Sequence, residues 1–244
     1  MVKFSNHDVL IHAAGVVKHY NALRPLRLQD WQLTRGHTAA LYGFDKAAAE
    51  LLVNLLTGSS LPDEGVVRAF GRATSEIADS ADWLESLRRF ALLSERTVLI
   101  EQLTVEQNLA IPHTLAVDPM PPEVRDAVRA VGDELGLSPA LLSASVQGLE
   151  PFDLIRVRLG RVLALGPELL LAEHPTAGFD RADTVRFARL VADVVARRRI
   201  AAVYFTADQE FAKVVGKEVL TLRPATGELS SSSGWRRWFG SSTS

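Results

Sequence analysis

The segment from Ala39 to Gly58 constrains the fold of this chain more than any other, because it has the pattern of a buried strand that turns directly into a helix. The first three residues are apolar, and Gly43 marks a turn two residues later. Residues 47–56 carry the apolar density of a helix packed against a sheet, and Thr57-Gly58 ends it. Such a unit predicts an α/β fold in which helices cover a sheet.

The spacing within this unit is that of a phosphate-binding loop, Gly-x-x-x-x-Gly-Lys-[Ser/Thr]. In a working loop the glycines let backbone N–H groups approach phosphate, the lysine meets the terminal phosphates, and the hydroxyl holds magnesium. Gly43 is present here, but the last three positions are Ala48, Ala49 and Glu50, followed by Leu51. The loop therefore keeps the layout without the groups that bind phosphate.

The residues after the helix make the likeness specific. Asn54 to Gly71 follow the pattern N-L-L-T-G…P-D-x-G-x-V-x-x-x-G nearly residue for residue, which resembles the ATP-binding subunits of ABC transporters. The resemblance extends from about Val9 to Leu222. It implies a P-loop NTPase-like ABC ATPase fold, in which a RecA-like mixed-sheet core carries a helical subdomain.

The resemblance assigns roles to several positions outside the loop. Tyr20 stands where the family stacks an aromatic ring on adenine, although a half-buried aromatic residue needs no ligand. Glu95 replaces the glutamine that senses magnesium and the attacking water. The family's Leu-Ser-Gly-Gly-Gln signature corresponds to Leu149, Glu150, Pro151, Phe152 and Asp153.

The strongest single match is the segment that family members end with Asp-Glu-Pro-Thr-x-x-x-Asp. Glu173 takes the place of the magnesium-coordinating aspartate, and His174 that of the general base. Asp180 resembles the aspartate that crosses the family's dimer interface, and it equally suits the N-cap of a following helix. Ala207 replaces the histidine of the switch strand.

These substitutions predict a loss of nucleotide binding and hydrolysis. A lysine on phosphate is worth about 1.5 to 3 kcal/mol, and Ala49 removes that contact. Glu50 sets a carboxylate near the phosphates, while Lys46 and Ala48 replace glycines where bare backbone is needed. Lys46 could instead reach a phosphate from an altered loop, or be a solvated lysine at the helix start. His174 is a possible base that lacks a phosphate cradle to act upon.

Composition excludes several other classes of protein. The formal net charge of −2 argues against nucleic acid as a main partner, and the absence of cysteine leaves no thiolate metal site. The six histidines show no paired spacing for zinc, so we expect no metal site of the chain's own. No apolar run approaches the ~20 residues that span a bilayer, and the N-terminus has no signal-peptide pattern, so we expect any membrane contact to be peripheral.

The predicted organisation is an ABC ATP-binding-type domain over residues 1–225, with a helical subdomain over about 96–165. A serine-rich tail over 226–244, which contains Gly234-Trp-Arg-Arg-Trp-Phe239, is expected to be disordered. The expected elements are strands at 9–17, 26–33, 38–42, 66–70, 168–172 and 200–206, and helices at 47–56, 103–113, 122–135, 152–165, 181–198 and from 209.

Three functions fit this sequence. The first is a non-hydrolysing transport subunit that keeps the fold to dimerise with a second ABC ATP-binding subunit and to dock on a transmembrane permease. The helices near 103–115 and 152–165 border the permease-docking surface in relatives. The second is an active ATPase that binds ATP and magnesium through unusual residues and drives transport, and the third is a free-standing binding protein. The resemblance implies a cytoplasmic location on the inner face of the cell membrane. Substrate, transport direction and the choice of homodimer or heterodimer cannot be read from the residues.

Overall fold

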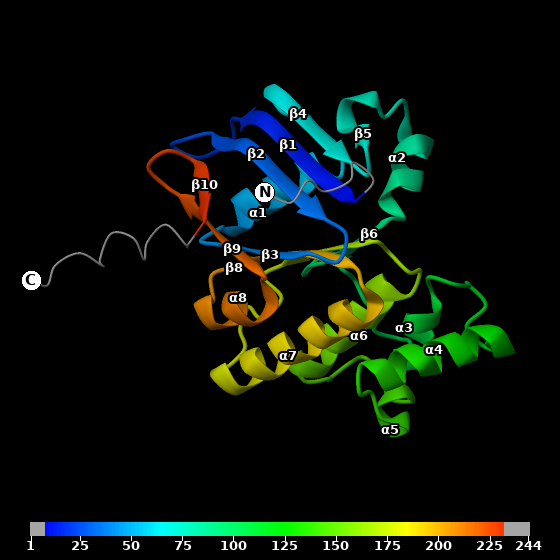
Figure 1. Cartoon of the computed structure of the whole chain (residues 1–244). Helices are drawn as coiled ribbons and strands as arrows, with labels where there is room; N and C mark the ends of the chain where they lie inside the picture. Colours follow the sequence, from blue (N-terminus) through cyan, green and yellow to red (C-terminus); the bar gives the residue numbers. More distant parts are fainter. Residues whose placement is uncertain (1–7, 232–244) are drawn as a thin grey trace, which may run out of the picture.

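The fold is built on one curled sheet of ten strands in a computed structural model that describes residues 8–231 (Figure 1). The strand order is β5-β4-β1-β2-β10-β9-β3-β8-β7-β6. The strands are β1 (Val9–Lys18), β2 (Leu26–Thr34), β3 (Thr38–Tyr42), β4 (Glu64–Ala69), β5 (Arg72–Ala73), β6 (Phe90–Leu93), β7 (Leu169–Glu173), β8 (Ala201–Thr206), β9 (Glu218–Arg223) and β10 (Glu228–Ser231).

The sheet has two halves of different character. Strands β5, β4, β1 and β2 are antiparallel neighbours, whereas β9, β3, β8, β7 and β6 are parallel. β10 joins the halves, because it pairs in parallel with β2 and antiparallel with β9. In Figure 1 the antiparallel half lies at the top and most helices lie below the parallel half.

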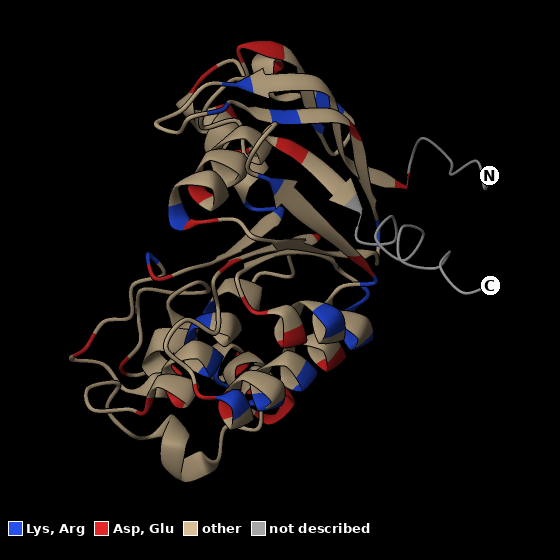
Figure 2. Cartoon of the chain, turned by 90° about the vertical axis from the view of Figure 1, so that its left-hand side faces the viewer, with Lys and Arg blue, Asp and Glu red and all other residues tan. Residues whose placement is uncertain are grey.

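The helices are α1 (Lys46–Leu56), α2 (Ser80–Leu87), α3 (Val105–Ala110), α4 (Pro122–Glu134), α5 (Pro139–Leu142), α6 (Pro151–Leu163), α7 (Arg181–Arg198) and α8 (Gln209–Val215). Six of the helices correspond to expected ones, in the same order along the chain, and α2 and α5 are additional. Within residues 8–231, no helix combines the length and the apolar character that crossing a membrane requires. Figure 2 shows basic and acidic residues interleaved over both the sheet and the helices.

The central parallel strands β3, β8 and β7 are buried on both faces, and they separate two hydrophobic cores. β8 shows the alternation: Val203 and Phe205 face the core around α1, and Ala202 and Tyr204 face the core beneath α6, α7 and α8. All six residues of β8 are buried, as is typical of a central parallel strand. Helix α1 lies between the two halves of the sheet, so the start of α1 and the ends of the parallel strands are held by the same core.

The structure departs from the expected elements in the places where local pattern is weakest. The helix expected at 103–113 is shorter, because Thr104 and Gln107 form a capping box that starts α3 at Val105. β6, β9 and α2 are not anticipated. The expectation of disorder from residue 226 is wrong for Glu228–Ser231, because these residues form β10, which pairs with β9 and β2. The Trp- and Arg-containing segment at 234–239 lies outside the described residues.

Candidate functional site

Four parallel strands deliver the candidate residues to one edge of the sheet. β3, β8, β7 and β6 are consecutive neighbours, with Tyr42 opposite Thr206 and Glu173 opposite Phe205. Parallel strands end on the same side, so the segments after them meet there. The structure therefore brings together the loop at Gly43, the turn at His174, the exposed Ala207 and the segment beginning at Ser94.

The loop after β3 is fixed by its glycine and by a buried ring. Gly43 has φ of 81°, in the left-handed region that glycine adopts without strain, and its N–H donates to the carbonyl of Thr206 at 3.1 Å. Phe44 is only 1% exposed and meets Phe205 edge-on, with 5.6 Å between ring centroids. The aromatic contact draws the loop against the end of β8.

The first turn of α1 is capped by the chain itself. The carboxylate of Asp45 accepts the N–H of Ala48 at 2.8 Å, and the carbonyl of Asp45 accepts the N–H of Ala49 at 3.0 Å. Ala48 and Ala49 are 1% and 0% exposed, so their methyl groups belong to the core. An aspartate three residues before the N–H it caps is a common helix start, and the sequence signal at Asp45 was present but overlooked.

Lys46 and Glu95 form an exposed ion pair between the start of α1 and the segment after β6, the region that we call the cleft and define by Asp45, Lys46, Glu50, Glu95, Arg96 and Glu173. The Nζ of Lys46 donates to Oε2 of Glu95 at 2.8 Å, and the two side chains are 73% and 66% exposed. Hydrogen bonding and charge from Lys46 lower the pKa of Glu95. Lys46, which could have reached a phosphate, thus contacts Glu95, which stands at the glutamine position that the resemblance implies.

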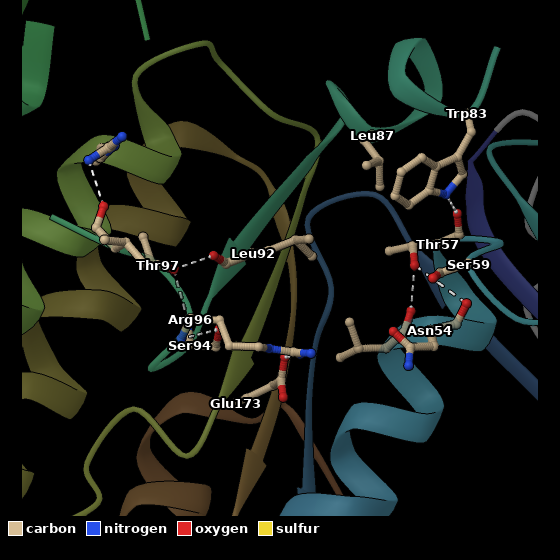
Figure 3. Close-up of a pocket in the computed structure, with 13 residues that line it drawn as sticks. Asn54, Thr57, Ser59, Trp83, Leu87, Leu92, Ser94, Arg96, Thr97 and Glu173 are labelled. Atoms are coloured by element: carbon tan, nitrogen blue, oxygen red, sulfur yellow. Dashed lines mark hydrogen bonds and ion pairs between the residues drawn. The ribbon is translucent and has the colours of Figure 1, made fainter. Parts of the chain in front are cut away.

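Arg96 joins two carboxylates that come from different elements. Its guanidinium donates to Oε1 of Glu50 at 2.8 Å and to Oε1 of Glu173 at 2.6 Å, and Figure 3 shows Arg96 beside Glu173. Glu173 is 13% exposed in its side chain. Burial alone would lower the pKa of Arg96, but the bond and charge of Glu173, with the charge of Glu50, raise it. Pattern matching missed Arg96, although it directly follows Glu95.

His174 lies in an unusual turn after β7. Its φ is 46°, its N–H donates to the carbonyl of Phe205 at 2.9 Å, and its carbonyl accepts the N–H of Ala177 at 3.0 Å. A non-glycine residue in the left-handed region costs about 1 kcal/mol or more. Its Nε2 is buried with no hydrogen-bond partner among the described residues.

Tyr20 lies within electrostatic reach of the loop. It is partly buried and packs against the core that contains α1. Burial and the nearby negative charge of Asp45 both disfavour the phenolate, so they raise the pKa of Tyr20 above 10.0. Leu51, the last residue of the predicted loop, packs against the same core.

The predicted signature segment forms the start of α6. Glu150 is the N-cap residue without a side-chain cap bond, and Pro151 is the first helical residue. Phe152 is 6% exposed, and the guanidinium of Arg186 lies 4.1 Å from its ring centroid. Asp153 pairs with Arg156, and the preceding Leu149 packs against the core beneath the sheet. Phe152 thus anchors the segment to the protein interior.

Asp180 and Asp208 both serve as helix caps. Asp180 accepts the N–H of Asp183 at 2.8 Å, which is the N-cap that its position predicted for α7. Asp208 accepts the N–H of Phe211 at 2.9 Å and caps α8, directly after Ala207. The cap and a contact across a dimer interface are compatible roles for Asp180.

A pocket of ≈ 490 Å³ opens between α1, α2 and the segment after β6 (Figure 3). We call it the Trp83 pocket. It is lined by Val53, Asn54, Thr57, Ser59, Trp83, Leu87, Leu92, Ser94, Arg96, Thr97, Val98, Arg161 and Glu173. Arg96 and Glu173 therefore contribute both to the cleft and to this pocket. Among residues 8–231, no cluster of three or more His, Cys, Asp or Glu side chains is arranged to hold a metal ion.

Comparison with known proteins gives concordant relatives. The chain is 31% identical over 195 residues to the phosphonates import ATP-binding protein of Anaeromyxobacter dehalogenans. The aligned region covers 76% of this chain and 38% of that protein. It is 24% identical over 212 residues to the lipoprotein-releasing system ATP-binding protein of Alcanivorax borkumensis. That alignment covers 85% of this chain and 92% of the relative. The chain spans less than two thirds of several relatives, including a macrolide export ATP-binding/permease protein of Aeromonas hydrophila, where it covers 27%. No family model matches the chain.

Solved structures confirm the fold. CbiO1 from Clostridium perfringens, described as part of an ABC transporter complex, superposes with a TM-score of 0.77 at 18% identity, covering 91% of this chain and 87% of that one. A dimeric ATP-binding cassette bound to ADP and phosphate gives a TM-score of 0.73 at 19% identity. The superposition covers 90% of this chain and 96% of the cassette. The predicted α/β fold of the ABC ATPase type is therefore correct.

Proposed function

Because this chain is a homologue of the ATP-binding proteins of ABC transporters and has the ABC ATPase fold, we propose that it is a non-hydrolysing subunit of a membrane transport complex. In this role it dimerises with a second ATP-binding-type subunit and docks on a transmembrane permease at the inner face of the membrane. One observation carries the proposal: in the loop that resembles a phosphate-binding loop, Asp45, Lys46 and Glu50 already contact partners within the same chain.

The fit to magnesium nucleotide is poor at the start of α1. Phosphate binding at a helix N-terminus needs free N–H groups, and here Asp45 already accepts the N–H of Ala48. A phosphate placed there would meet the carboxylates of Asp45 and Glu50 with no lysine at position 49. Ala48 and Ala49 are buried in the core, so neither offers a cation or a hydroxyl group to phosphate.

The groups that hydrolysis requires are committed to other contacts. Glu173, at the family's magnesium position, is paired with Arg96, and Glu95, at the glutamine position, is paired with Lys46. Ala207 has no side chain that could contact a γ-phosphate. Phosphoryl transfer depends on groups that are held in place to stabilise developing charge. Because Glu173 and Glu95 are paired with Arg96 and Lys46, these contacts argue against ATP hydrolysis by the chain alone.

The Trp83 pocket supports the docking role. It lies where α1, α2 and the segment after β6 meet, and its lining combines the apolar surfaces of Leu87, Leu92 and Val98 with two arginines. Val98 is 70% exposed, and Leu84 on α2 is 57% exposed, so apolar surface continues outside the pocket. A concave apolar site with a polar rim suits a short amphipathic helix of a permease.

The test separates a scaffold from an enzyme. Purified full chain is titrated with a fluorescent ATP analogue plus magnesium, and phosphate release is measured on the same samples. We expect no saturable binding below millimolar nucleotide and no phosphate release above background. The control restores Ala48→Gly, Ala49→Lys and Glu50→Ser, and it should bind more tightly. Micromolar binding with phosphate release by the unaltered chain would refute the proposal.

The alternative function is an active ATPase with unusual residues. It is favoured by the relationship to ATP-binding proteins and by His174, whose buried Nε2 lacks a partner at the end of β7. Replacing His174 with Ala should leave phosphate release at background if the chain is a scaffold. A hydrolytic rate that falls on this replacement would support the enzyme instead.

A further inference from the structure

Arg96 connects three elements that meet at the cleft. It belongs to the segment after β6, and it pairs with Glu50 on α1 at 2.8 Å and with Glu173 at the end of β7 at 2.6 Å. The guanidinium fork suits two carboxylates at once, which a lysine would contact through a single charged point. Removing Arg96 would leave the mostly buried Glu173 without a cation and facing another carboxylate.

The segment that carries Arg96 is also a wall of the Trp83 pocket. Ser94, Thr97 and Val98 line that pocket together with Arg96. A short turn shapes the segment, because the N–H of Thr97 donates to the carbonyl of Ser94 at 3.0 Å and Oγ1 of Thr97 donates to the carbonyl of Leu92 at 2.9 Å. On the far side, Arg161 donates to the carbonyl of Val98 at 2.7 Å.

The two ends of this wall are thus held differently from its middle. Hydrogen bonds to backbone fix Leu92 and Val98, whereas ion pairs connect the middle of the segment with its neighbours: Arg96 with α1 and β7, and Glu95 with α1. The Lys46–Glu95 pair also crosses the cleft, but both side chains are largely exposed and such pairs contribute little.

We propose that Arg96 is a positioning residue, an internal cation that holds the 94–98 segment and the wall of the Trp83 pocket in one shape without nucleotide. This rests on the proposed function as a docking subunit. In that role the chain presents the same docking surface whether or not ATP is present, because the cation that organises the cleft is part of the protein. The partner is the amphipathic permease segment that the pocket suits.

Hydrogen–deuterium exchange on the full chain tests this inference. Amide exchange at 94–98 is followed in the unaltered protein, in Arg96→Ala, in Arg96→Lys and in the matched control Lys46→Ala. We expect Arg96→Ala to speed exchange at 94–98 by roughly fivefold with peptides of β8 unchanged, since local opening requires little of the core. The exchange rate of Arg96→Lys at 94–98 should lie between those of the unaltered protein and Arg96→Ala. The exchange rate of Lys46→Ala should equal that of the unaltered protein.

Millimolar magnesium ATP is then added to the unaltered protein, and exchange at 94–98 should not change. Two results would overturn the inference: unchanged exchange at 94–98 in Arg96→Ala, or a change of exchange there on adding nucleotide. If Arg96→Ala speeds exchange throughout the chain, a Glu173→Gln variant, which removes the negative charge while keeping the shape, replaces it with the same two criteria. The nucleotide titration reports on the proposed function separately, so failure of one can be told from failure of the other.

Discussion

At the scale of single residues, the cleft is defined by side chains that satisfy one another. Asp45 caps α1, Lys46 meets Glu95, and Arg96 lies between Glu50 and Glu173. Glu50, Glu95 and Glu173 each pair with a cation from the same chain. Two cations thus serve three glutamates, and removing either cation would leave at least one carboxylate without its partner.

Replacing Asp45 with Ala should lower the free energy of unfolding by about 1 kcal/mol, because the N–H of Ala48 loses its cap. Urea unfolding followed by circular dichroism measures the change. Asp45→Asn is the control, since an asparagine side chain caps nearly as well. An equal loss in both variants would mean that the charge of Asp45, rather than its cap, stabilises the fold.

Acid should weaken the contact between β5 and α2 through Asp82. Hydrogen bonds from Arg72 and from the N–H of Ala78 lower the pKa of Asp82 from 3.8 to about 2. A group with a lowered folded pKa stabilises the fold fully above its unfolded pKa and loses that contribution as pH falls through the folded value. The thermal midpoints of the unaltered chain and Asp82→Asn should therefore differ above pH 4 and converge toward pH 2. A difference at pH 2 as large as the difference at pH 6 would contradict this.

At the scale of elements, sequence patterns predict the helices and strands that have a clear apolar periodicity. They miss strands that form because a neighbouring strand pairs with them. β2, β3, α4 and α7 follow from apolar periodicity and recognisable ends. β9 and β10 do not, since their strand identity comes from hydrogen bonds to β3 and β2 rather than from a strong local pattern. The motif positions could be located by spacing, but Arg96 could not be assigned because its partners come from Glu50 and Glu173, far apart in the chain.

The start of α6 should not tolerate the family's signature glycine. Phe152 is 6% exposed and contacts Phe179, with ring centroids 6.1 Å apart. Phe152→Ala should cost about 3 to 5 kcal/mol because it opens a cavity, and Phe152→Leu less than about 1.5 kcal/mol. Chemical denaturation of the three proteins measures both values. A loss below 1 kcal/mol for the alanine variant would show that the segment does not depend on this ring.

At the scale of the whole molecule, the chain has the ABC ATPase fold, and the scaffold role that we propose depends on that shape rather than on nucleotide. The two cores and the curled sheet account for the match to solved cassettes at 18 to 20% identity. A fold depends on which positions are buried and does not by itself fix the chemistry of a site.

Nucleotide should leave the association state of the chain unchanged. The resemblance implies that two subunits clamp ATP between the phosphate loop of one and the signature of the other, and the segments of this chain that match those motifs carry Glu50 in the first and Glu150 with Phe152 in the second. Light scattering coupled to gel filtration should give the same mass with and without millimolar magnesium ATP. A dimer that forms only with nucleotide would contradict the account.

The most direct measurement is a crystal structure of the unaltered chain grown with excess magnesium and a non-hydrolysable ATP analogue. The account predicts that Asp45 still caps Ala48, that Arg96 still bridges Glu50 and Glu173, and that no nucleotide density lies against residues 43–51. An ordered magnesium nucleotide seated on that loop, with Arg96 displaced from its two carboxylates, would contradict it.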